Sequence, residues 1–295
     1  MAPFFYCNKM IINDLLNQGI KSLGDKPSAS LDVEVVLSHV LGEDRGFLFM
    51  NPNFNVSDEL ACLFLNYIGR IGSGEPVAYI TNLKEFYGLD FFVDDRVLIP
   101  RPETEEIVTK VLKFLDESCN SSLRILDVGT GSGNIPVAIA ASFDMDRDIL
   151  IDAVDISENA LQVAQLNIET HCVEDRVHVF QGDLLEVIDE GEEYDVIVAN
   201  LPYIGEIENR FVSPETEKYE PNLALFAGVD GLSLYEGMFQ EMVDKSLKYG
   251  LLIGEFGAGQ RESMGKLLEK YFPERWSIEN DLAGIERVFI VLPLL

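Results

Sequence analysis

The sequence predicts an α/β fold in which a doubly wound, mostly parallel sheet carries helices on both faces. The main observation is that strand-like and helix-like segments alternate from Glu103 onward, which is typical of such sheets. Before that point, residues 8–82 carry apolar residues at helical spacing, so a separate helical domain is expected there. A length of 295 residues is sufficient for two domains.

The first predicted domain covers residues 1–82 and consists of helices. One helix follows from the apolar residues within 10–23, a second begins near Ser28 and ends at Gly42, and a third starts after Ser57. Serine hydroxyls accept hydrogen bonds from the first turn of a helix, and glycine often terminates one. No pattern typical of catalysis occurs here, so we expect this domain to serve substrate recognition.

Residues 83–102 are expected to form a short β-hairpin that links the two domains. Aromatic and β-branched residues between Phe86 and Ile99 surround turn signals at Gly88 and at the pair Asp94 and Asp95. The catalytic domain is then expected to cover residues 103–295.

Each element of that second domain follows from the alternation. The expected helices cover residues 105–115, 135–142, 158–169, 233–247 and 261–271. The expected strands cover residues 124–128, 150–154, 177–180, 196–199, 251–255 and 287–292. Ligands on such sheets bind at the carboxyl ends of the strands, so the loops after Val128, Val154, Phe180 and Ala199 are candidate site regions.

Composition and charge exclude several classes of protein. Lysine and arginine number 22 against 51 aspartate and glutamate residues, which gives a formal net charge of −29. A surface this negative repels phosphate, so direct nucleic-acid binding is not expected. The four cysteines form no CxxC pair and no cluster with histidine, so neither a disulfide framework nor a metal site is expected. No signal peptide or membrane-spanning run is evident, which predicts a cytoplasmic protein.

A glycine-rich loop follows the first strand of the sheet. Residues 127–134 read Asp-Val-Gly-Thr-Gly-Ser-Gly-Asn, and glycines at alternate positions let the backbone turn sharply and approach a ligand. The loop is not a P-loop, because no Gly-Lys-Ser/Thr follows, and Asn134 replaces the third glycine of the dinucleotide fingerprint. The candidate cofactor-binding residues of the loop are Gly129, Thr130, Gly131, Ser132 and Gly133.

Two acidic residues follow the next two strands. Asp155 can accept both hydroxyl hydrogens of a ribose. Asp183 can accept from an adenine amino group while Leu184 packs on the ring. With the glycine loop, this pattern resembles the S-adenosylmethionine site of class I methyltransferases. The resemblance implies S-adenosyl-L-methionine as the cofactor.

Residues 199–203, Ala-Asn-Leu-Pro-Tyr, resemble the Asn/Asp-Pro-Pro-Tyr signature of methyltransferases that act on a planar amino group, of an adenine or of an amide. The Asn200 side-chain oxygen and the Leu201 carbonyl can accept the two N–H bonds and align the nitrogen with the methyl group. Tyr203 can stack on the planar group, and Pro202 stiffens the turn. These four residues are the candidate catalytic and substrate-binding residues. Leu201 stands where the signature has proline, so the carbonyl is kept but the fixed φ is lost.

Several other stretches resemble the bacterial release factor glutamine methyltransferases, the PrmC or HemK family. They are residues 74–80, 85–88, 98–105, 220–225, 228–232 and 281–287, together with Glu255 and Gln260. The resemblance implies a seven-stranded Rossmann-like sheet and methylation of the amide nitrogen (N5) of the glutamine in the Gly-Gly-Gln motif of peptide chain release factors. It implies that the loop 129–133, Asp155, Leu184 and Asn200 bind the cofactor and that residues 200–203 hold the glutamine.

The resemblance has two further consequences. Release factors are the expected protein partners of a chain that we expect to be monomeric. Pro102 and Glu103 can open the helix that follows, whose first turn is expected to close over the cofactor.

Two other functions use the same residues. A DNA adenine-N6 methyltransferase would need the same chemistry at Asn200, but the charge of −29 and the lack of a basic stripe count against it. A non-catalytic S-adenosylmethionine-binding partner of release factors is the second alternative, and Leu201 is the residue that supports it.

Overall fold

The structure, a computed structural model of the chain, describes residues 10–144, 147–205, 213–281 and 283–293. The chain divides into two compact units between Asn82 and Leu83. Residues 1–9 of the predicted first domain lie outside the described ranges. Among the described residues, no helix is long and apolar enough to cross a membrane.

The first unit is helical, as predicted. Its helices are α1 (Ile12–Leu23), α2 (Ala29–Leu41), α3 (Arg45–Met50), α4 (Asp58–Gly72) and α5 (Val77–Thr81), and a two-stranded sheet joins β1 (Met10–Ile11) to β2 (Asn55–Val56). Gly42 ends α2 with φ of 68°, and the Ser57 hydroxyl caps α4 by accepting from the amide of Leu60 at 3.3 Å. Ser28 occupies the N-cap position of α2 as predicted, but its hydroxyl donates to the Asp32 carboxylate at 2.8 Å and accepts no hydrogen bond from the first turn.

The second unit opens with a hairpin of β3 (Lys84–Phe86) and β4 (Leu89–Phe91). Tyr87 and Gly88 form its turn with φ of 54° and 75°, which is typical of a two-residue turn with both central residues left-handed. The hairpin is shorter than predicted, since residues 92–101 contain no strand.

A seven-stranded sheet forms the centre of this unit, as the fold prediction required. Its order is β10-β11-β9-β8-β5-β6-β7, and the strands from β9 to β7 are parallel while β11 and β10 pair antiparallel. The strands are β5 (Ser122–Val128), β6 (Asp148–Asp155), β7 (Val177–Gln181), β8 (Glu193–Ala199), β9 (Lys248–Glu255), β10 (Trp276–Asn280) and β11 (Glu286–Val291). The sequence did not locate β10 or the short helix α9 (Pro214–Tyr219).

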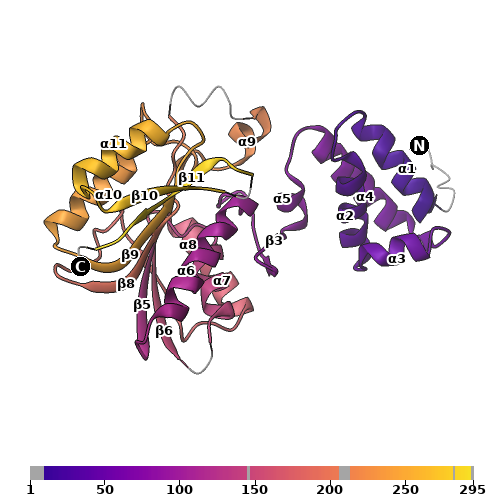
Figure 1. Ribbon diagram of the computed structural model, residues 1–295. Coiled ribbons are helices and arrows are strands. Elements are labelled where there is room, and N and C mark those ends of the chain that lie inside the picture. The colour runs from indigo at the N-terminus through magenta and orange to yellow at the C-terminus, as the bar shows by residue number, and fades with distance from the viewer. Residues whose placement is uncertain (1–9, 145–146, 206–212, 282, 294–295) are drawn as a thin grey trace. The chain divides into compact units, whose positions relative to one another are not determined.

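Helices cover both faces of the sheet (Figure 1). They are α6 (Glu105–Glu117), α7 (Asn134–Ser142) and α8 (Glu158–Thr170) on one face, and α10 (Ser233–Asp244) and α11 (Arg261–Tyr271) on the other. Successive strand residues face opposite sides, so Ile125 packs with α6 and α7 while Leu126 packs with α10 and α11. Both faces are therefore buried, as in other doubly wound sheets.

The register of the sheet aligns the ends of its central strands. Val128, the last residue of β5, pairs with Val154 of β6 on one side and with Ala199 of β8 on the other. The glycine loop, Asp155 and Asn200 therefore all start from the same level at one edge of the sheet.

Candidate active site

Two cavities lie at the carboxyl ends of the parallel strands. The larger, of about 540 Å³, contains Asn200 and Tyr203 and is named the Asn200 cavity. The smaller, of about 160 Å³, lies beside Gly129 and Gly131 and is named the glycine-loop cavity. Four residues line both cavities: Leu98, Leu201, Pro202 and Ala224. The two cavities therefore meet at an apolar boundary.

The glycine loop is held in place by the neighbouring strand. The amides of Gly129 and Thr130 donate to the Val154 carbonyl at 2.8 and 3.0 Å. The amide of Gly131 donates to Asp155 Oδ2 at 2.8 Å. Gly133, with φ of 75°, precedes α7, and a Cβ there would lie 3.2 Å from Ala164 of α8, so only glycine allows this close approach.

The predicted cofactor residues divide into three groups. Five of the predicted residues line the glycine-loop cavity: Gly129, Gly131, Asp155, Asp183 and Leu184. Thr130 and Ser132 are buried within the loop, and Gly133 packs on α8, so these three shape the loop without lining the cavity. Asn200 faces the other cavity.

Asp155 fixes two backbone segments at once. Its second oxygen, Oδ1, accepts from the Ser157 amide at 2.9 Å, and Ser157 in turn caps α8. Burial raises the pKa of Asp155, and the hydrogen bonds from Ser157 and Gly131 oppose that rise. Its carboxylate thus joins the glycine loop to the start of α8.

Asp127, at the base of the loop, has a buried carboxyl group that no described residue binds through a well-aligned hydrogen bond. In the described part of the chain, its two oxygens and the Thr130 hydroxyl make no hydrogen bond of good geometry. Burial raises the pKa of Asp127 to about 7, which the nearby Thr130 hydroxyl opposes and the negative charge of Asp155 reinforces. The folded protein therefore holds a proton here that the unfolded chain releases near pH 3.8.

Asp127 should make stability depend on pH in an unusual direction. Because the pKa of this acid is higher in the folded state, stability is lost as the pH rises from 3.8 through about 7. Asp127→Asn removes that loss, so between pH 5 and 8 its free energy of unfolding should rise by about 2–3 kcal/mol relative to wild type. Urea unfolding followed by the fluorescence of Trp276, the single tryptophan, measures this, with exposed Asp189→Asn as control. If the difference in unfolding free energy between Asp127→Asn and wild type stayed constant from pH 5 to 8, the raised pKa of Asp127 would be contradicted.

The turn 199–203 is braced from behind by buried side chains. The phenol of Tyr235 lies 3.1 Å from the Ala199 carbonyl and accepts from the Leu201 amide at 3.3 Å, so it contacts both neighbours of Asn200. Gln260 Nε2 donates to the Tyr203 carbonyl at 2.7 Å. These bonds fix the backbone on both sides of Asn200.

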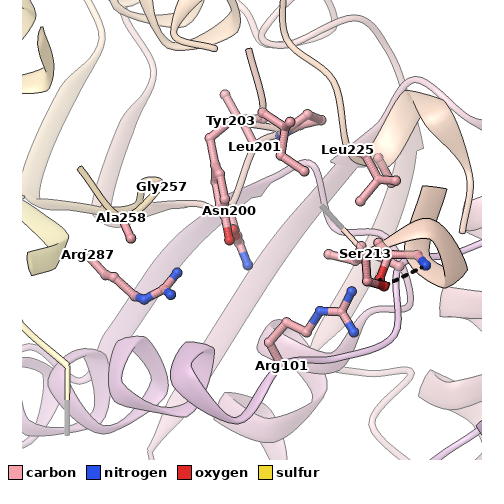
Figure 2. Close-up of a pocket in the computed structure, with 14 residues that line it drawn as sticks. Arg101, Asn200, Leu201, Tyr203, Ser213, Leu225, Gly257, Ala258 and Arg287 are labelled. Carbon is pink, nitrogen blue, oxygen red and sulfur yellow. Dashed lines mark hydrogen bonds between the residues drawn. The ribbon is translucent and has the colours of Figure 1, made fainter. Parts of the chain in front are cut away.

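Two oxygen atoms of this turn remain available as acceptors. Among the described residues, no donor contacts Asn200 Oδ1 or the Leu201 carbonyl. Figure 2 shows the Asn200 side chain projecting into the cavity, toward which the guanidinium groups of Arg101 and Arg287 also extend. The site thus presents two acceptors that can hold both N–H bonds of one amino group.

A buried carboxylate lies behind Asn200 and Tyr203. Glu255, at the end of β9 and 2% exposed, accepts from the Thr104 hydroxyl at 2.7 Å and from the Tyr203 hydroxyl at 3.0 Å. Asn200 Nδ2 lies 3.3 Å from the same Thr104 hydroxyl. Burial raises the pKa of Glu255, while the two hydroxyls and the charge of Arg287 lower it.

The segment after the hairpin contributes to both cavities. Arg96 and Leu98 line the glycine-loop cavity, whereas the turn η1 (Pro102–Thr104) that opens α6 does not. Thr104 contacts Asn200, and the closure of this turn over the cofactor stays a prediction. Arg101 donates to the buried Glu220 at 2.6 Å, which ties this segment to residues 220–225 at the wall of both cavities.

Comparison with known proteins follows the same division of the chain. The model of the PrmC N-terminal domain matches residues 14–81, and that of ribosomal protein L11 methyltransferase (PrmA) matches residues 106–209. A release factor glutamine methyltransferase of Bacillus anthracis is 37% identical over 86% of this chain and 89% of its own length. One of Koribacter versatilis is 34% identical over 95% and 98%.

The chain belongs to the release factor glutamine methyltransferase family. A solved structure shares the fold of this chain. The catalytic domain of hMettl16 in complex with MAT2A 3′UTR hairpin 1 covers 87% of this chain and 90% of its own, with a TM-score of 0.58 and 15% identity. At that identity the likeness concerns the fold alone.

Leu201 departs from the family's usual proline, and the structure gives the residue a packing role. Its side chain is 3% exposed, and its Cδ2 would lie 2.9 Å from a Cβ at Gly129. The Leu201 side chain therefore closes the space beneath the glycine loop.

Replacing Leu201 with proline should affect stability more than catalysis. The variant loses the amide that donates to Tyr235 and leaves space at Gly129, so unfolding free energy should fall by about 1–3 kcal/mol. The rate constant for methyl transfer, kcat, should stay within about tenfold of wild type because the carbonyl remains. Leu201→Ala keeps the backbone amide and loses only the side-chain packing at Gly129, so it separates the loss of packing from the loss of the hydrogen bond to Tyr235. A hundredfold fall in kcat for the proline variant alone would show that the amide positions the turn.

Sequence reasoning missed most of the residues that support the site in this family member. They are Thr104, Glu220, Tyr235, Glu255, Gln260 and Arg287. All except Tyr235 lie in stretches that resemble the family, but the resemblance assigned contacts to none of them. Thr104 and Glu255 are 151 positions apart, a separation that no local pattern reveals.

Proposed function

We propose that this chain transfers a methyl group from S-adenosyl-L-methionine to the side-chain amide nitrogen (N5) of a glutamine in peptide chain release factors. The observation that carries the proposal is the pair of available acceptors, Asn200 Oδ1 and the Leu201 carbonyl, beside the boundary of the two cavities. Family membership supports the release factor as the substrate, since the relatives carry that name. The partner is thus a protein, and we propose a monomeric enzyme that acts in the cytoplasm.

The residues at the glycine-loop cavity fit S-adenosylmethionine. Gly131 has open space where a Cβ would be, so a ligand can reach its backbone. Asp155 lines the cavity as a carboxylate that can accept ribose hydroxyls, and Leu184 adds an apolar wall. The unpaired oxygens of Asp127 lie at the base of the same loop. We assign the cofactor to Gly129, Gly131, Asp155, Asp183 and Leu184, with Thr130, Ser132 and Gly133 shaping the loop.

The residues of the Asn200 cavity would perform the following chemistry. Bound S-adenosylmethionine supplies an electrophilic methyl group. An amide nitrogen is a poor nucleophile because its lone pair is delocalised into the carbonyl. Asn200 Oδ1 and the Leu201 carbonyl would accept its two N–H bonds, fix its direction and favour localisation of the lone pair. Tyr203 would stack on the planar amide, with its hydroxyl held by Glu255.

Proton balance requires no strong base at this site. As the new C–N bond formed, the bond between the methyl carbon and the sulfonium sulfur would break and leave its electron pair on sulfur. The nitrogen would become cationic, and its proton would leave readily to water. Most of the acceleration then comes from alignment, for which oriented reactants gain effective molarities of roughly 10⁵ M or more. The braced turn 199–203 provides such alignment.

The comparisons do not favour a DNA adenine methyltransferase, although its chemistry would suit Asn200 equally. The curated relatives act, by name, on release factors. The formal charge of −29 also opposes binding to duplex DNA.

The deciding experiment supplies the purified chain with methyl-labelled S-adenosylmethionine and a release factor. One sample contains the wild-type factor and the other a factor whose Gly-Gly-Gln glutamine is alanine. Label on the wild-type factor alone would support reaction, substrate and position together. Label on neither, with cofactor binding retained by calorimetry, would favour the non-catalytic alternative, and label on added duplex DNA would favour the adenine enzyme.

A further inference from the structure

Two buried residues, Glu255 and Thr104, form a chain of hydrogen bonds with the half-buried Asn200 behind the proposed acceptor site. Glu255 at the end of β9, Thr104 before α6 and Asn200 after β8 come from three separate elements. The Thr104 hydroxyl lies 2.7 Å from Glu255 Oε2 and 3.3 Å from Asn200 Nδ2. Thr104 is 1% exposed and Glu255 is 2% exposed, so water does not compete for these contacts.

When Glu255 is ionised, these hydrogen bonds can be donated in one direction only, from Asn200 to Thr104 and from Thr104 to Glu255. An ionised carboxylate only accepts, so the single hydroxyl hydrogen of Thr104 must point to Glu255. The Thr104 oxygen can then only accept from Asn200, and the amide of Asn200 must turn its NH₂ group to Thr104. Its oxygen consequently faces the cavity, where an N–H bond of the substrate needs an acceptor.

We propose that Thr104 and Glu255 are positioning residues that set which end of the Asn200 amide faces the substrate. This inference rests on the proposed function. It adds a determinant to that function, because an asparagine side chain alone has no preference between presenting its oxygen and presenting its NH₂. With the amide reversed, the NH₂ group would point at the N–H bond of the substrate, and two donors repel.

The direction of these hydrogen bonds depends on whether Glu255 is ionised. Among the described residues, the charged or titratable groups around it are Arg287, Glu103, Tyr203 and Tyr235. Tyr203 donates its hydroxyl to the other oxygen, Oε1, and Arg287 supplies positive charge that lowers the pKa, while Glu103 raises it. A protonated Glu255 could donate to Thr104 and so allow the Asn200 amide to reverse. Activity should therefore fall as the pH drops through the raised pKa of Glu255.

Two substitutions at Thr104 distinguish the effect of its hydroxyl from the effect of its side-chain packing. Thr104→Val keeps the shape but removes the hydroxyl, and we expect kcat to fall about 10- to 100-fold, with KM for the release factor and Kd for S-adenosylmethionine within about threefold. Thr104→Ser keeps the hydroxyl and should retain kcat within about threefold. Thr109→Val and Thr109→Ser, on the exposed face of α6, are the matched controls.

The outcomes are distinct. Wild-type kcat in Thr104→Val would overturn the proposal, and so would an equal loss in Thr104→Val and Thr104→Ser, because the hydroxyl would then be irrelevant. A loss confined to Thr104→Val supports the proposal. Should Thr104→Val not fold, the comparison of Thr104→Ser with wild type over pH 5 to 8 still tests it, since both should lose activity at the same low pH.

A spectroscopic measurement makes the test independent of methyl transfer. The side-chain NH₂ signals of Asn200, assigned by their absence in Asn200→Asp, should shift as Glu255 titrates in wild type and stay constant in Thr104→Val. Constant signals in wild type would contradict the directed chain even if methylation is observed. If wild type methylates no release factor, the proposed function fails, and the NMR result still decides whether Glu255 directs Asn200.

Discussion

Replacing Asn200 with alanine is expected to lower kcat for methyl transfer by about 10²- to 10³-fold, the range observed when one preorganised polar group is removed from a transition-state site. The side-chain oxygen that would accept one N–H bond of the substrate is lost. The Leu201 carbonyl remains, because Tyr235 and Gln260 hold the turn through the backbone on either side. Asn200 does not line the glycine-loop cavity, so affinity for S-adenosylmethionine should fall less than tenfold.

Single-turnover methylation of a release factor and calorimetric binding of S-adenosylmethionine measure the two effects. Asn120→Ala is the matched control. It also removes a side-chain amide that makes a hydrogen bond, at 2.9 Å to Asp195, but it lies before β5, at the opposite edge of the sheet. Turnover that survives in Asn200→Ala would refute the role proposed for this residue.

Gly231→Ala should be the most damaging single change of a glycine to alanine in the second unit. A Cβ at this position would lie 2.2 Å from the Tyr203 carbonyl and 2.5 Å from Gln260 Nε2. The new methyl group therefore separates the two groups whose hydrogen bond braces the turn. Gly231 also has φ of 73°, which is unfavourable for alanine. We expect a loss of about 3–5 kcal/mol in unfolding free energy and of at least about 100-fold in kcat.

Gly191→Ala separates the two causes. Gly191 has φ of 78° but nothing within 4 Å of its Cβ position, so alanine there meets only the backbone penalty, about 1–2 kcal/mol. Denaturant unfolding followed by Trp276 fluorescence, together with kcat, compares the two variants in the same unit. Equal losses in both would show that the predicted collision at Tyr203 is relieved by small movements.

Local chemistry explains which elements the sequence could predict. Gly42 and Ser57 mark helix ends through their own backbone and hydroxyl, so their neighbours are sufficient to identify them. The strand β10 was missed because none of its residues, Trp276 to Asn280, is fully buried and because it is an edge strand that pairs only with β11. The hairpin ends early because Asn167 of α8, 75 positions away, binds both the amide and the carbonyl of Phe92.

The candidate site divides in the same way. Residues that follow strands directly, such as Asp155 and Asn200, could be predicted because parallel strands bring their carboxyl ends together. The residues that orient them could not, because Tyr235 reaches the turn from α10 and Thr104 from the start of α6. These contacts depend on how helices pack on the sheet, which has no signature in a short stretch of sequence.

The alignment of Val128 with Val154 and Ala199 has a consequence for how preparations of this protein are judged. A slip of β8 by one residue would exchange the two faces of the strand and move Asn200 away from the level of the glycine loop. Such a misassembled sheet would keep its helix and strand content, and circular dichroism would not distinguish it from the native form. Specific activity per bound cofactor is therefore a stricter criterion of correct folding than any spectrum of secondary structure.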